Sequence, residues 1–334
     1  MIMAASIPGL SDLVDPDVRD RVAAFLTGVE TELLVAVTSP DPLIDEAAAH
    51  LVRAGGKRFR PLTVSLCAQL GDPSRPELLT AAVLMELTHL ATLYHDDVMD
   101  EAPLRRGAAS ANSRWSNRIA VYVGDFLLAR AAEMAASLGE EAVRLQASTL
   151  AQLVRGQLAE TVGPRGGDPI RHHLQVVEDK TASLIATSAR FGGLFSGLPG
   201  HHVRTLAEYG TAIGIAFQLS DDLLDIASET AQSGKTPGTD LREGVPTLPV
   251  LYVLSDPATG GPRLRELLSK GPLTDDEEHA EALGLLRESA ALKQARETVH
   301  GYAEVARRSA GTLPAGPARR ALEQLCEYIA DRTG

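Results

Sequence analysis

The amino-acid sequence predicts an all-α fold. Of its 334 residues, 44% are hydrophobic and only 4% are aromatic, while Ala and Leu are abundant. Apolar residues recur along the chain with helical spacing, and the alternation typical of strands is almost absent. Because this composition favours packed helices over sheets, and no Pro/Gly/Ser-rich linker or low-complexity block marks a boundary, we expect a helical core without an obvious division.

Proline and glycine signals set the expected limits of the helices. The first helix ends at Ser39-Pro40-Asp41-Pro42, the second stops at Gly55-Gly56, and Pro61 can open the third. In chain order, the expected helices cover residues 17–38, 43–54, 61 to about 71, 76–100, 112–137, 140–162 and 170–190, with several more in 250–334. Residues 228–249 are predicted to form a loop, and residues 1–15 a flexible N-terminus.

The charge balance and the cysteines limit the possible functions. A net charge of −12 argues against nucleic acid as a partner, so an anionic substrate would be held locally by metal and a few basic residues. Cys67 and Cys326 have no metal-ligand spacing and are interpreted as free thiols of a reducing compartment. We find no secretory signal and no stretch long enough for a transmembrane segment, so the expected location is cytoplasmic.

Two acidic triads occur inside otherwise apolar stretches. Both have the spacing i, i+1, i+4, which places three carboxylates on one side of a helix. Their members are Asp96, Asp97 and Asp100 in the first triad, and Asp221, Asp222 and Asp225 in the second. One such triad is commonly a solvated helix face, but two on apolar helices indicate a hard divalent cation such as Mg²⁺. We expect the two helices to face each other across a cavity.

Basic residues precede and follow the first triad. In GGKRFRP at 55–61, a glycine pair leads into a helix start, where Lys57 and Arg60 would form an anion site. A basic loop at a helix junction without a ligand is the alternative. Arg105 and Arg106 directly follow the triad, and arginine suits two-point binding of phosphate.

Further basic side chains lie elsewhere along the chain. His89 lies two turns before the first triad on the same face, either as a functional residue or as a satisfied core histidine. Lys180 stands among small residues and is expected to face a cavity. Lys235 lies in the loop after the second triad, where a flap could close over phosphate. The pairs His172-His173 and His201-His202 point to different helix faces and are interpreted as structural.

Taken together, these residues suit the departure of a diphosphate group. No Ser-His-Asp set, P-loop or GxGxxG motif is present. Mg²⁺ held by the carboxylates, at about three ions per site, would neutralise the charge that develops as the diphosphate leaves. An allylic carbocation would remain in an apolar cavity that excludes water. A second basic pocket would place another diphosphate beside it, built from Lys57, Arg60, His89 and Arg106.

The motifs resemble those of the trans-prenyltransferases, or (all-E) polyprenyl diphosphate synthases, and in particular the bacterial long-chain members. The resemblance covers roughly residues 40–334 and rests on GGKRFRP (55–61), HDDVMD (95–100), RRG (105–107), GDFLLARA (124–131), KT (180–181), FQLSDDLLD (217–225) and GKTPGTDL (234–241). It implies a single domain over 1–334, a bundle of about a dozen helices around a central cavity of the isoprenoid synthase type. It also implies a homodimer that condenses isopentenyl diphosphate with an allylic prenyl diphosphate, with transient membrane contact as a route for product release.

The same resemblance implies roles for individual residues. The six aspartates would bind Mg²⁺ and, through it, the allylic diphosphate. The implied catalytic residues are Lys180, Thr181 and Gln218, of which Thr181 and Gln218 would steady the cation. Direct contacts to the allylic diphosphate would come from Arg105, Lys180 and Lys235. Isopentenyl diphosphate would be bound by Lys57, Arg60, His89 and Arg106. Many relatives carry a second flap lysine where this chain has Val245, so Lys235 and Arg242 would supply the charge, or the flap would close differently.

The residues before the first triad predict the product length. Eight, five and four positions before Asp96 lie the small residues Thr88, Ala91 and Thr92, which we expect to line a chain-length pocket. One helical turn of about 5.4 Å is comparable with one extended isoprene unit, so no bulky plug stands in the first two turns. This predicts a product longer than fifteen carbons and favours a quinone side-chain precursor over geranylgeranyl diphosphate. A bulky residue from another helix that closes the pocket is the alternative.

Three other functions share parts of the pattern. A class I terpene cyclase has a similar first motif, but its second metal motif differs from DDLLD and it lacks GGKR. A metal phosphohydrolase would use His95 and Asp96 as an HD pair and needs further grouped histidines. A non-catalytic partner subunit would tend to lose one triad, whereas both are intact here.

Overall fold

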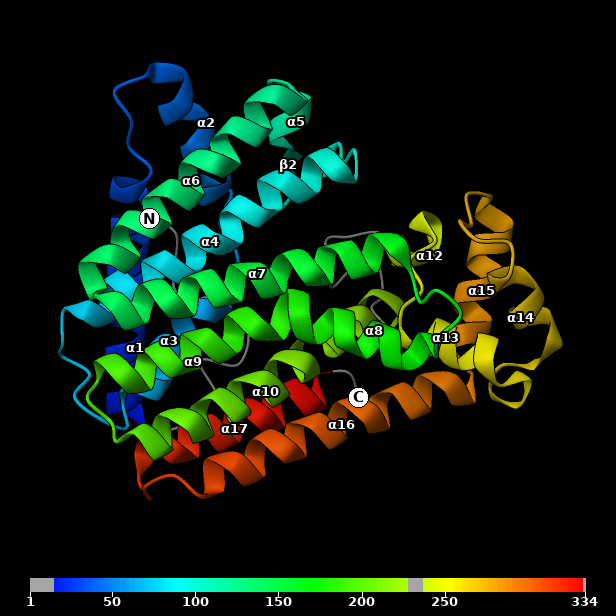
Figure 1. Cartoon of the computed structure of the whole chain (residues 1–334). Helices are drawn as coiled ribbons and strands as arrows, with labels where there is room; N and C mark the ends of the chain where they lie inside the picture. Colours follow the sequence, from blue (N-terminus) through cyan, green and yellow to red (C-terminus); the bar gives the residue numbers. More distant parts are fainter. Residues whose placement is uncertain (1–14, 228–236, 333–334) are drawn as a thin grey trace. The chain divides into compact units, whose positions relative to one another are not determined.

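The all-α prediction is confirmed in the computed structural model, which describes residues 15–227 and 237–332 (Figure 1). The helices are α1 Pro16–Ala36, α2 Pro42–Arg53, α3 Phe59–Ala68, α4 Glu77–Met99, α5 Ala111–Arg114, α6 Asn117–Leu138, α7 Glu140–Val162, α8 Pro169–Val177, α9 Ser183–Phe195, α10 Gly200–Ala227, α12 Thr239–Glu243, α13 Leu248–Ser255, α14 Gly261–Leu268, α15 Asp276–Arg287, α16 Ala290–Gly311 and α17 Pro317–Asp331. A π-helical turn, η2, covers Glu178–Ala182, and a 3₁₀ turn, η3, covers Pro257–Thr259. Of the N-terminal stretch expected to be flexible, residues 1–14 lie outside the described part.

Aspartate–proline pairs start three of the helices. Asp15, Asp41 and Asp168 each accept a hydrogen bond from a backbone N–H of the first turn, and a proline follows each of them. The carboxylate satisfies a donor that has no partner within the helix, and proline needs none at this position. The sequence therefore encodes these three helix starts locally.

Several expected helix limits differ from the structure, and the loop expected over 228–249 contains α12 and the first two residues of α13. Helix α3 begins at Phe59, two residues before Pro61, because a proline anywhere in the first turn leaves no required donor missing. The helix expected over 112–137 is two helices, α5 and α6, and the Ser116 side chain accepts from Ile119 N to cap the second one. The helix expected over 170–190 is α8 and α9 with the π-helical turn η2 between them.

The described residues divide into two compact units, so the expected single domain stays a prediction. Unit 1 comprises the described parts of 1–151, 184–210 and 309–324, and unit 2 those of 152–183, 211–308 and 325–332. In unit 1, α4 packs along α6, and both α1 and α3 pack on α4. Its core includes Leu33, Leu51, Leu87 and Tyr94, all buried. The Tyr94 hydroxyl donates to Ala47 O, which ties α4 to α2.

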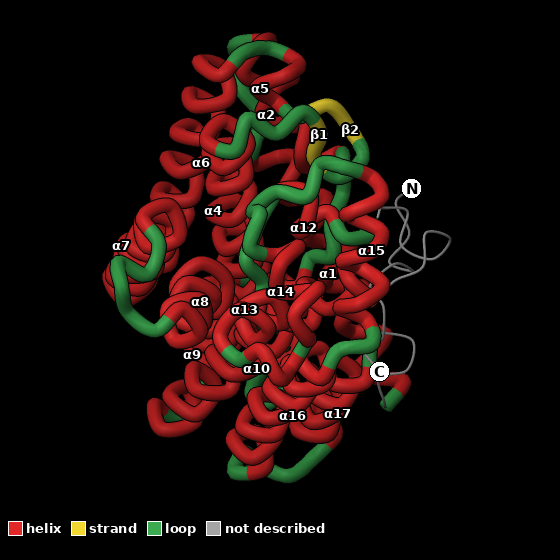
Figure 2. Tube along the Cα trace, turned by 90° about the vertical axis from the view of Figure 1, so that its right-hand side faces the viewer, coloured by secondary structure: helices red, strands yellow, loops and turns green. Residues whose placement is uncertain are grey.

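A short hairpin follows the first acidic triad (yellow in Figure 2). Its strands, β1 Leu104–Arg105 and β2 Ala108–Ala109, pair antiparallel with Arg105 opposite Ala108. The two turn residues, Arg106 and Gly107, both have positive φ, 55° and 77°. This is the backbone that a two-residue hairpin turn requires. The turn lets the chain reverse, so that neighbouring arginines reach different parts of unit 1.

Unit 2 surrounds the second triad with short helices. Helix α8 packs on η2 and α13, and α14 packs on α13 and α15. On α10, Leu219, Leu223 and Ile226 are buried, and Arg287 on α15 donates to Ile226 O at 2.7 Å. No helix in the described ranges has the length and apolar character of a membrane span.

Candidate active site

The first triad lies at the C-terminal end of α4, and its three carboxylates differ in environment. Asp97 is fully buried, Asp96 is half-buried and Asp100, the C-cap residue, is exposed. Arg105 Nε donates to Asp97 Oδ1 at 2.6 Å, whereas Asp97 Oδ2 is buried without a hydrogen-bond partner among the described residues. Burial raises the pKa of Asp97, and Arg105 opposes this only in part. Asp97 therefore has unused capacity for a cation.

The basic residues of unit 1 gather around the loop between α2 and α3. The expected ligand Arg106 donates from Nη1 to the carbonyls of Leu51 and Gly55. Arg60 is partly buried, its Nε has no partner in the described structure, and burial lowers its pKa to about 10. Burial also lowers the pKa of His89, and Arg60 and Arg106 lower it further. The structure thus brings three of the four residues expected to bind isopentenyl diphosphate into one electrostatically coupled cluster. Lys57, the fourth, is exposed.

Unit 2 contains a cavity of about 370 Å³ beside the second triad. The catalytic residues implied by the resemblance all line it, together with Asp222 and the flap residue Val245. Its other lining residues are Glu160, Gly163, Pro164, Pro169, His172, His173, Val176, Val177, Asp240, Pro246, Thr247 and Leu251. An apolar wall with a few polar side chains is typical of a site for a small molecule.

A hydrogen-bonded chain runs along one wall of this cavity. Thr181 Oγ1 donates to Gln218 Oε1 at 3.0 Å, and Gln218 Nε2 donates to Asp222 Oδ1 at 2.9 Å. This order fixes the orientation of the Gln218 amide, with its carbonyl toward Thr181. Burial raises the pKa of Asp222 to about 8, although the bond from Gln218 lowers it. A nearby cation would stabilise the charged form of this carboxylate, which burial disfavours.

The π-helical turn places Lys180 and Thr181 at the cavity. Lys180 Nζ pairs with Glu160 on α7. Gly156 on the same helix allows α7 and the π-helical turn to approach each other closely. A Cβ at Gly156 would lie 2.9 Å from Asp179 Cβ and from Lys180 Cγ. Single π-turns are frequently found at functional sites because they widen the helix locally.

The other two carboxylates of the second triad have partners within unit 2. Arg332 Nη2 lies 2.8 Å from Asp221 Oδ1, and the same guanidinium stacks on Phe217. Asp225 Oδ2 accepts from Asp240 N at 3.1 Å, which anchors the start of α12. Lys235, the expected flap ligand, lies outside the described residues.

His173 is a cavity residue that was interpreted as structural from the sequence. Its Nε2 lies 4.0 Å from Asp222 Oδ2 and is buried without a hydrogen-bond partner in the described part of the chain. Burial, with a contribution from His172, lowers the pKa of His173 to about 4, so the ring is neutral at pH 7. The signal available in the sequence was its position seven residues before Lys180, two turns earlier on the same face.

The three residues expected to line the chain-length pocket differ in accessibility. Thr88 and Ala91 are buried in the packing of α4, and the Thr88 hydroxyl donates to Leu84 O. Thr92 is partly exposed, and its hydroxyl donates to His89 O. Of the three positions, Thr92 is therefore the one at which a larger side chain has the most room.

The carboxylates fit a hard divalent cation. Asp97 and Asp222 both have pKa values raised by burial, which shows that neighbouring positive charge does not compensate them fully. Oxygen ligands of this kind suit Mg²⁺. Over residues 15–227 and 237–332, no three Asp, Glu, His or Cys side chains are already gathered into one metal-binding cluster.

Comparisons with known proteins agree with this chemistry. A family model described as polyprenyl synthetase matches residues 41–286. A nonaprenyl diphosphate synthase of Mycobacterium tuberculosis is 47% identical over 325 residues, 97% of each chain. A dimethylallyltranstransferase of the same organism is 41% identical, over 96% of this chain and 98% of its own. A crystal structure of geranylgeranyl pyrophosphate synthase from Corynebacterium glutamicum, complexed with calcium and isoprenyl diphosphate, superposes with a TM-score of 0.86 at 42% identity, over 96% and 98% of the two chains.

Proposed function

We propose a function from the premise that this chain belongs to the polyprenyl synthetase family and is a prenyltransferase. It elongates an allylic prenyl diphosphate with isopentenyl diphosphate, in a magnesium-dependent reaction that gives an all-trans polyprenyl diphosphate. The observation that carries this proposal is the cavity of unit 2, where Lys180, Thr181, Gln218 and Asp222 meet on an apolar wall. These groups suit a substrate with an anionic head and a hydrocarbon tail.

The residues of unit 2 hold the allylic substrate. Bound Mg²⁺ supplies positive charge that stabilises the departing diphosphate. Lys180, which pairs with Glu160 here, turns its ammonium to the diphosphate oxygens. The Gln218 carbonyl and the Thr181 hydroxyl present oxygen to the electron-deficient carbon chain, and the bond between them keeps both in place. The apolar wall excludes water that would otherwise capture the cation.

The residues of unit 1 bind the second substrate. Lys57 and Arg60 take the diphosphate of isopentenyl diphosphate, and the neutral His89 donates a hydrogen bond to it from its ring N–H. Arg106 contributes its remaining donors. Arg105, which pairs with Asp97 here, and Lys235 complete the contacts to the allylic diphosphate.

We infer a product longer than fifteen carbons, a precursor of a quinone side chain. The small residues Thr88, Ala91 and Thr92 before the first triad support this inference, as does the identity to a nonaprenyl diphosphate synthase. The alternative product, geranylgeranyl diphosphate, is the one named for the similar structure from C. glutamicum. The two products differ in the number of isoprene units added, so a mass spectrum separates them.

Further parts of the proposal concern ions and assembly. The six aspartates hold about three Mg²⁺ per site, since two charges per ion balance six carboxylates.

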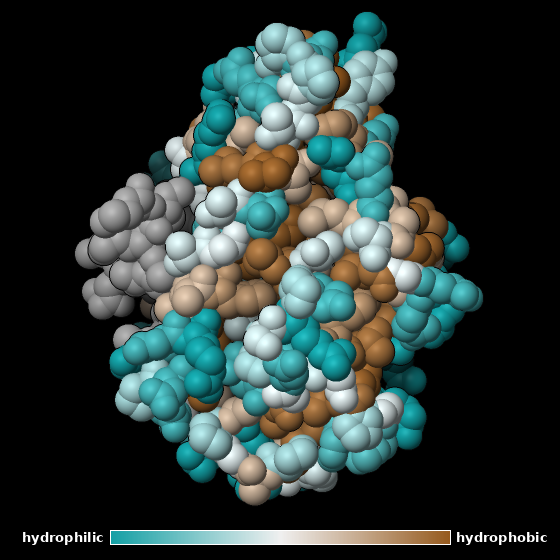
Figure 3. Space-filling view, turned by 90° about the vertical axis from the view of Figure 1, so that its left-hand side faces the viewer, coloured by the Kyte–Doolittle hydropathy of each residue, from teal (hydrophilic) through white to brown (hydrophobic). Residues whose placement is uncertain are grey.

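The chain forms a cytoplasmic homodimer that contacts a membrane only transiently, as product leaves. Apolar side chains reach the surface between polar ones on one face (Figure 3), and on α6 Val121 and Tyr122 are 36% and 60% exposed. Sedimentation velocity of the purified chain tests the dimer.

One experiment tests the central proposal. Purified protein is incubated with Mg²⁺, farnesyl diphosphate and labelled isopentenyl diphosphate, and the products are analysed by mass spectrometry. Incorporation of several labelled units is expected. A terpene cyclase would consume the allylic diphosphate without isopentenyl diphosphate, and a phosphohydrolase would release phosphate without forming a carbon–carbon bond. Either of these results, or an inactive chain that needs a partner subunit, would refute the proposal.

A further inference from the structure

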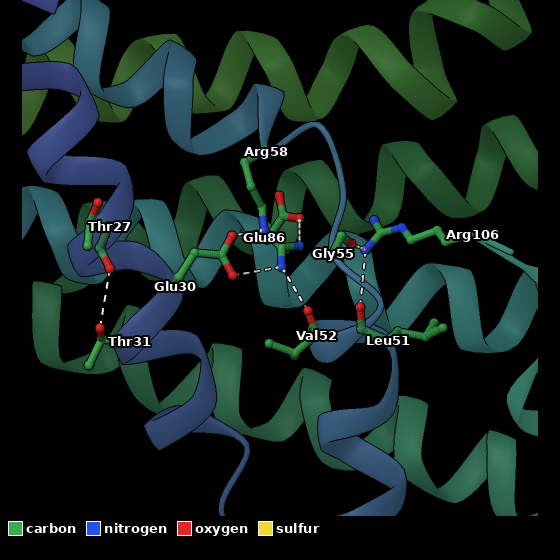
Figure 4. Close-up of polar contacts among 9 residues, drawn as sticks. All are labelled: Thr27, Glu30, Thr31, Leu51, Val52, Gly55, Arg58, Glu86 and Arg106. Carbon is green, nitrogen blue, oxygen red and sulfur yellow. Dashed lines mark hydrogen bonds and ion pairs between the residues drawn. The ribbon is translucent and has the colours of Figure 1, made fainter. Parts of the chain in front are cut away.

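The loop between α2 and α3 is built on a buried arginine, Arg58 (Figure 4). Its side chain is 4% exposed. Nε and Nη2 form a two-point ion pair with Glu30 on α1, at 2.5 and 3.1 Å. Nη1 donates to Glu86 Oε1 on α4 at 2.8 Å, and Nη2 also donates to Val52 O near the end of α2, at 3.1 Å. One guanidinium thus ties this loop to three helices of unit 1.

The donors of Arg58 are almost all used within the protein. A guanidinium has five N–H donors, and the four bonds to Glu30, Glu86 and Val52 leave about one of them. Arg60, two residues later, differs because its Nε is buried without a partner among the described residues. The two arginines therefore differ: Arg60, in the first turn of α3, keeps a donor that can bind an anion, while Arg58 uses its donors to hold the loop.

The backbone at Arg58 needs such a restraint. Arg58 has φ 47° and ψ 35°, a left-handed conformation that residues with a Cβ rarely adopt. The preceding Gly55 and Gly56 also have positive φ, 83° and 152°. The chain therefore turns sharply between Lys57 and the start of α3. Without the ion pairs, a non-glycine residue would favour a right-handed or extended backbone here, which would redirect Lys57.

A second arginine, Arg106, also binds the backbone beside this loop. Arg106, at the tip of the hairpin, donates to Leu51 O and Gly55 O. A Cβ at Gly56 would lie 2.8 Å from Arg106 Cζ, so the absence of a side chain at Gly56 allows this arginine to enter. The loop is thus held on one side by Arg58 and on the other by Arg106.

The charges around the loop leave it suited to an anion. Glu86 compensates part of the positive charge of Arg58, Arg60 and Arg106, and its Oε2 is buried without a partner in the described residues. Burial lowers the pKa of Arg58, but Glu86 and Glu30 more than offset this and raise it overall. Arg58 is thus charged and paired with both Glu30 and Glu86, whereas Arg60 keeps a buried Nε without a hydrogen-bond partner among the described residues.

We propose that Arg58 is a positioning residue for the second substrate, acting through the loop rather than by contact. Its bridge between Glu30 and Glu86 sets the backbone from which Lys57 and Arg60 bind the diphosphate of isopentenyl diphosphate. The inference rests on the proposed function and extends it to residues that touch no substrate. The proposal predicts an effect on one substrate only. Loss of the ion pairs of Arg58 with Glu30 and Glu86 weakens the binding of isopentenyl diphosphate and leaves the binding of the allylic diphosphate unchanged.

Steady-state kinetics of Arg58→Lys test this consequence. Lysine keeps the charge but has no planar fork, so it can pair with only one of the two carboxylates. The KM for isopentenyl diphosphate is expected to rise about 10-fold, while kcat and the KM for the allylic diphosphate change by less than about 2-fold. Arg53→Lys, at an exposed arginine in the last turn of α2, is the matched control and should leave both constants unchanged.

A second variant serves if Arg58→Lys folds poorly. Glu30→Gln preserves shape and keeps the bond between Arg58 and Glu86, so a smaller increase of the same KM is expected. All assays are made well below the melting temperature of each variant, and circular dichroism verifies the fold. An equal rise of both KM values, or a lower melting temperature with unchanged KM values, would show a merely structural role and overturn the inference.

A binding measurement separates this inference from the proposed function. Inorganic diphosphate is titrated into the protein without Mg²⁺ by calorimetry, which requires no turnover. If the wild type makes no elongated product, the proposed function fails, but an affinity for diphosphate about 10-fold weaker in Arg58→Lys would still support the positioning role. Equal affinities of wild type and variant would refute it, whatever the kinetics of the wild type.

Discussion

At four single residues, burial shifts the pKa of a side chain and neighbouring charges do not reverse the shift. Asp97, His89, Asp222 and His173 all have pKa values shifted mainly by burial. Burial raises the pKa of the two carboxyl groups and lowers the pKa of the two imidazoles. In each case the shift disfavours the charged form, so the side chain can respond strongly to a ligand of suitable charge.

The stability of the free protein is expected to depend on pH through His89. The folded pKa of this ring lies below its ordinary value of 6.5, mainly because of burial and then because of Arg60 and Arg106. Below pH 6.5 the unfolded chain therefore binds a proton that the folded chain does not, and stability falls as the pH falls, by at most about 1.4 kcal/mol per pH unit. In His89→Gln this contribution is absent.

Urea unfolding at pH 5, 6, 7 and 8 measures the effect. Below pH 6.5, the free energy of unfolding of the wild type should decrease relative to that of His89→Gln. His300→Gln, at an exposed position on α16, is the control and should show no such trend. A difference that does not vary with pH would contradict the lowered pKa of this partly buried ring.

A single substitution on α4 is expected to shorten the product. Thr92 lies one turn before Asp96 and is partly exposed, so a phenylalanine there has room to project into the path of a growing chain. Ala91 is fully buried, and a large side chain at that position would overpack the core instead. Thr92→Phe should reduce the main product by several isoprene units, as measured by mass spectrometry, with Thr92→Ser as control. An unchanged product would refute the pocket assignment.

At the scale of elements, the interruption between α8 and α9 governs the cavity of unit 2. A regular helix over 170–190 would place Lys180 and Thr181 about 100° apart around its axis. The π-helical turn Glu178–Ala182 widens the helix at this point, and both residues line the same cavity. Gly156 on α7 provides the space in which this wider turn fits.

Gly156→Ala is therefore expected to reduce the rate. The added Cβ would meet Asp179 Cβ and Lys180 Cγ at 2.9 Å, so η2 has to shift and Thr181 moves with it. Displacements of this kind at a reacting centre commonly cost about 10- to 100-fold in kcat. Gly301→Ala on α16 is a matched control, because a Cβ there meets nothing within 4 Å, and it should be neutral or stabilise by about 0.4–1 kcal/mol. Full activity of Gly156→Ala would contradict the role of the turn.

At the scale of the whole molecule, each of the two units carries one acidic triad and its own basic residues. The chain has a net charge of −12, so its long-range field repels diphosphates, and local cations have to overcome that repulsion. The proposed reaction needs magnesium on the carboxylates of both triads.

Neutralising one carboxylate in either triad tests this requirement. Asp97→Asn and Asp222→Asn should each reduce kcat by at least about 100-fold, and the double variant should lose little more than either single one, because residues that act together are not additive. The Mg²⁺-dependent increase in melting temperature should shrink in both single variants. Asp72→Asn, at an exposed carboxylate of unit 1, serves as control. A single variant with nearly wild-type activity would exclude its triad from the site.

The sequence predicted the helical architecture, and it singled out Lys180, Thr181, Gln218 and Asp222, which line the cavity of unit 2. Helical periodicity and the i, i+1, i+4 triads are local patterns, and the structure confirms the helices. It missed the cavity position of His173 because a paired histidine leaves the apolar periodicity unchanged, and it missed the π-helical turn because five residues are too short a stretch for a change of period to be recognised. It gave Arg58 no role, since only contacts to distant helices reveal what this side chain holds together.

The amino-acid order alone determined which side chains are available to bind metal and diphosphate, because the spacing of charged groups along a helix fixes the face on which they lie. Tertiary packing decided which of those groups are already neutralised by a neighbour and which are left with an unused donor or acceptor. That division depends on burial and on partners tens of residues away, such as Glu30 for Arg58 and Gln218 for Asp222. Both are properties of the folded chain, and no local pattern of residues contains them.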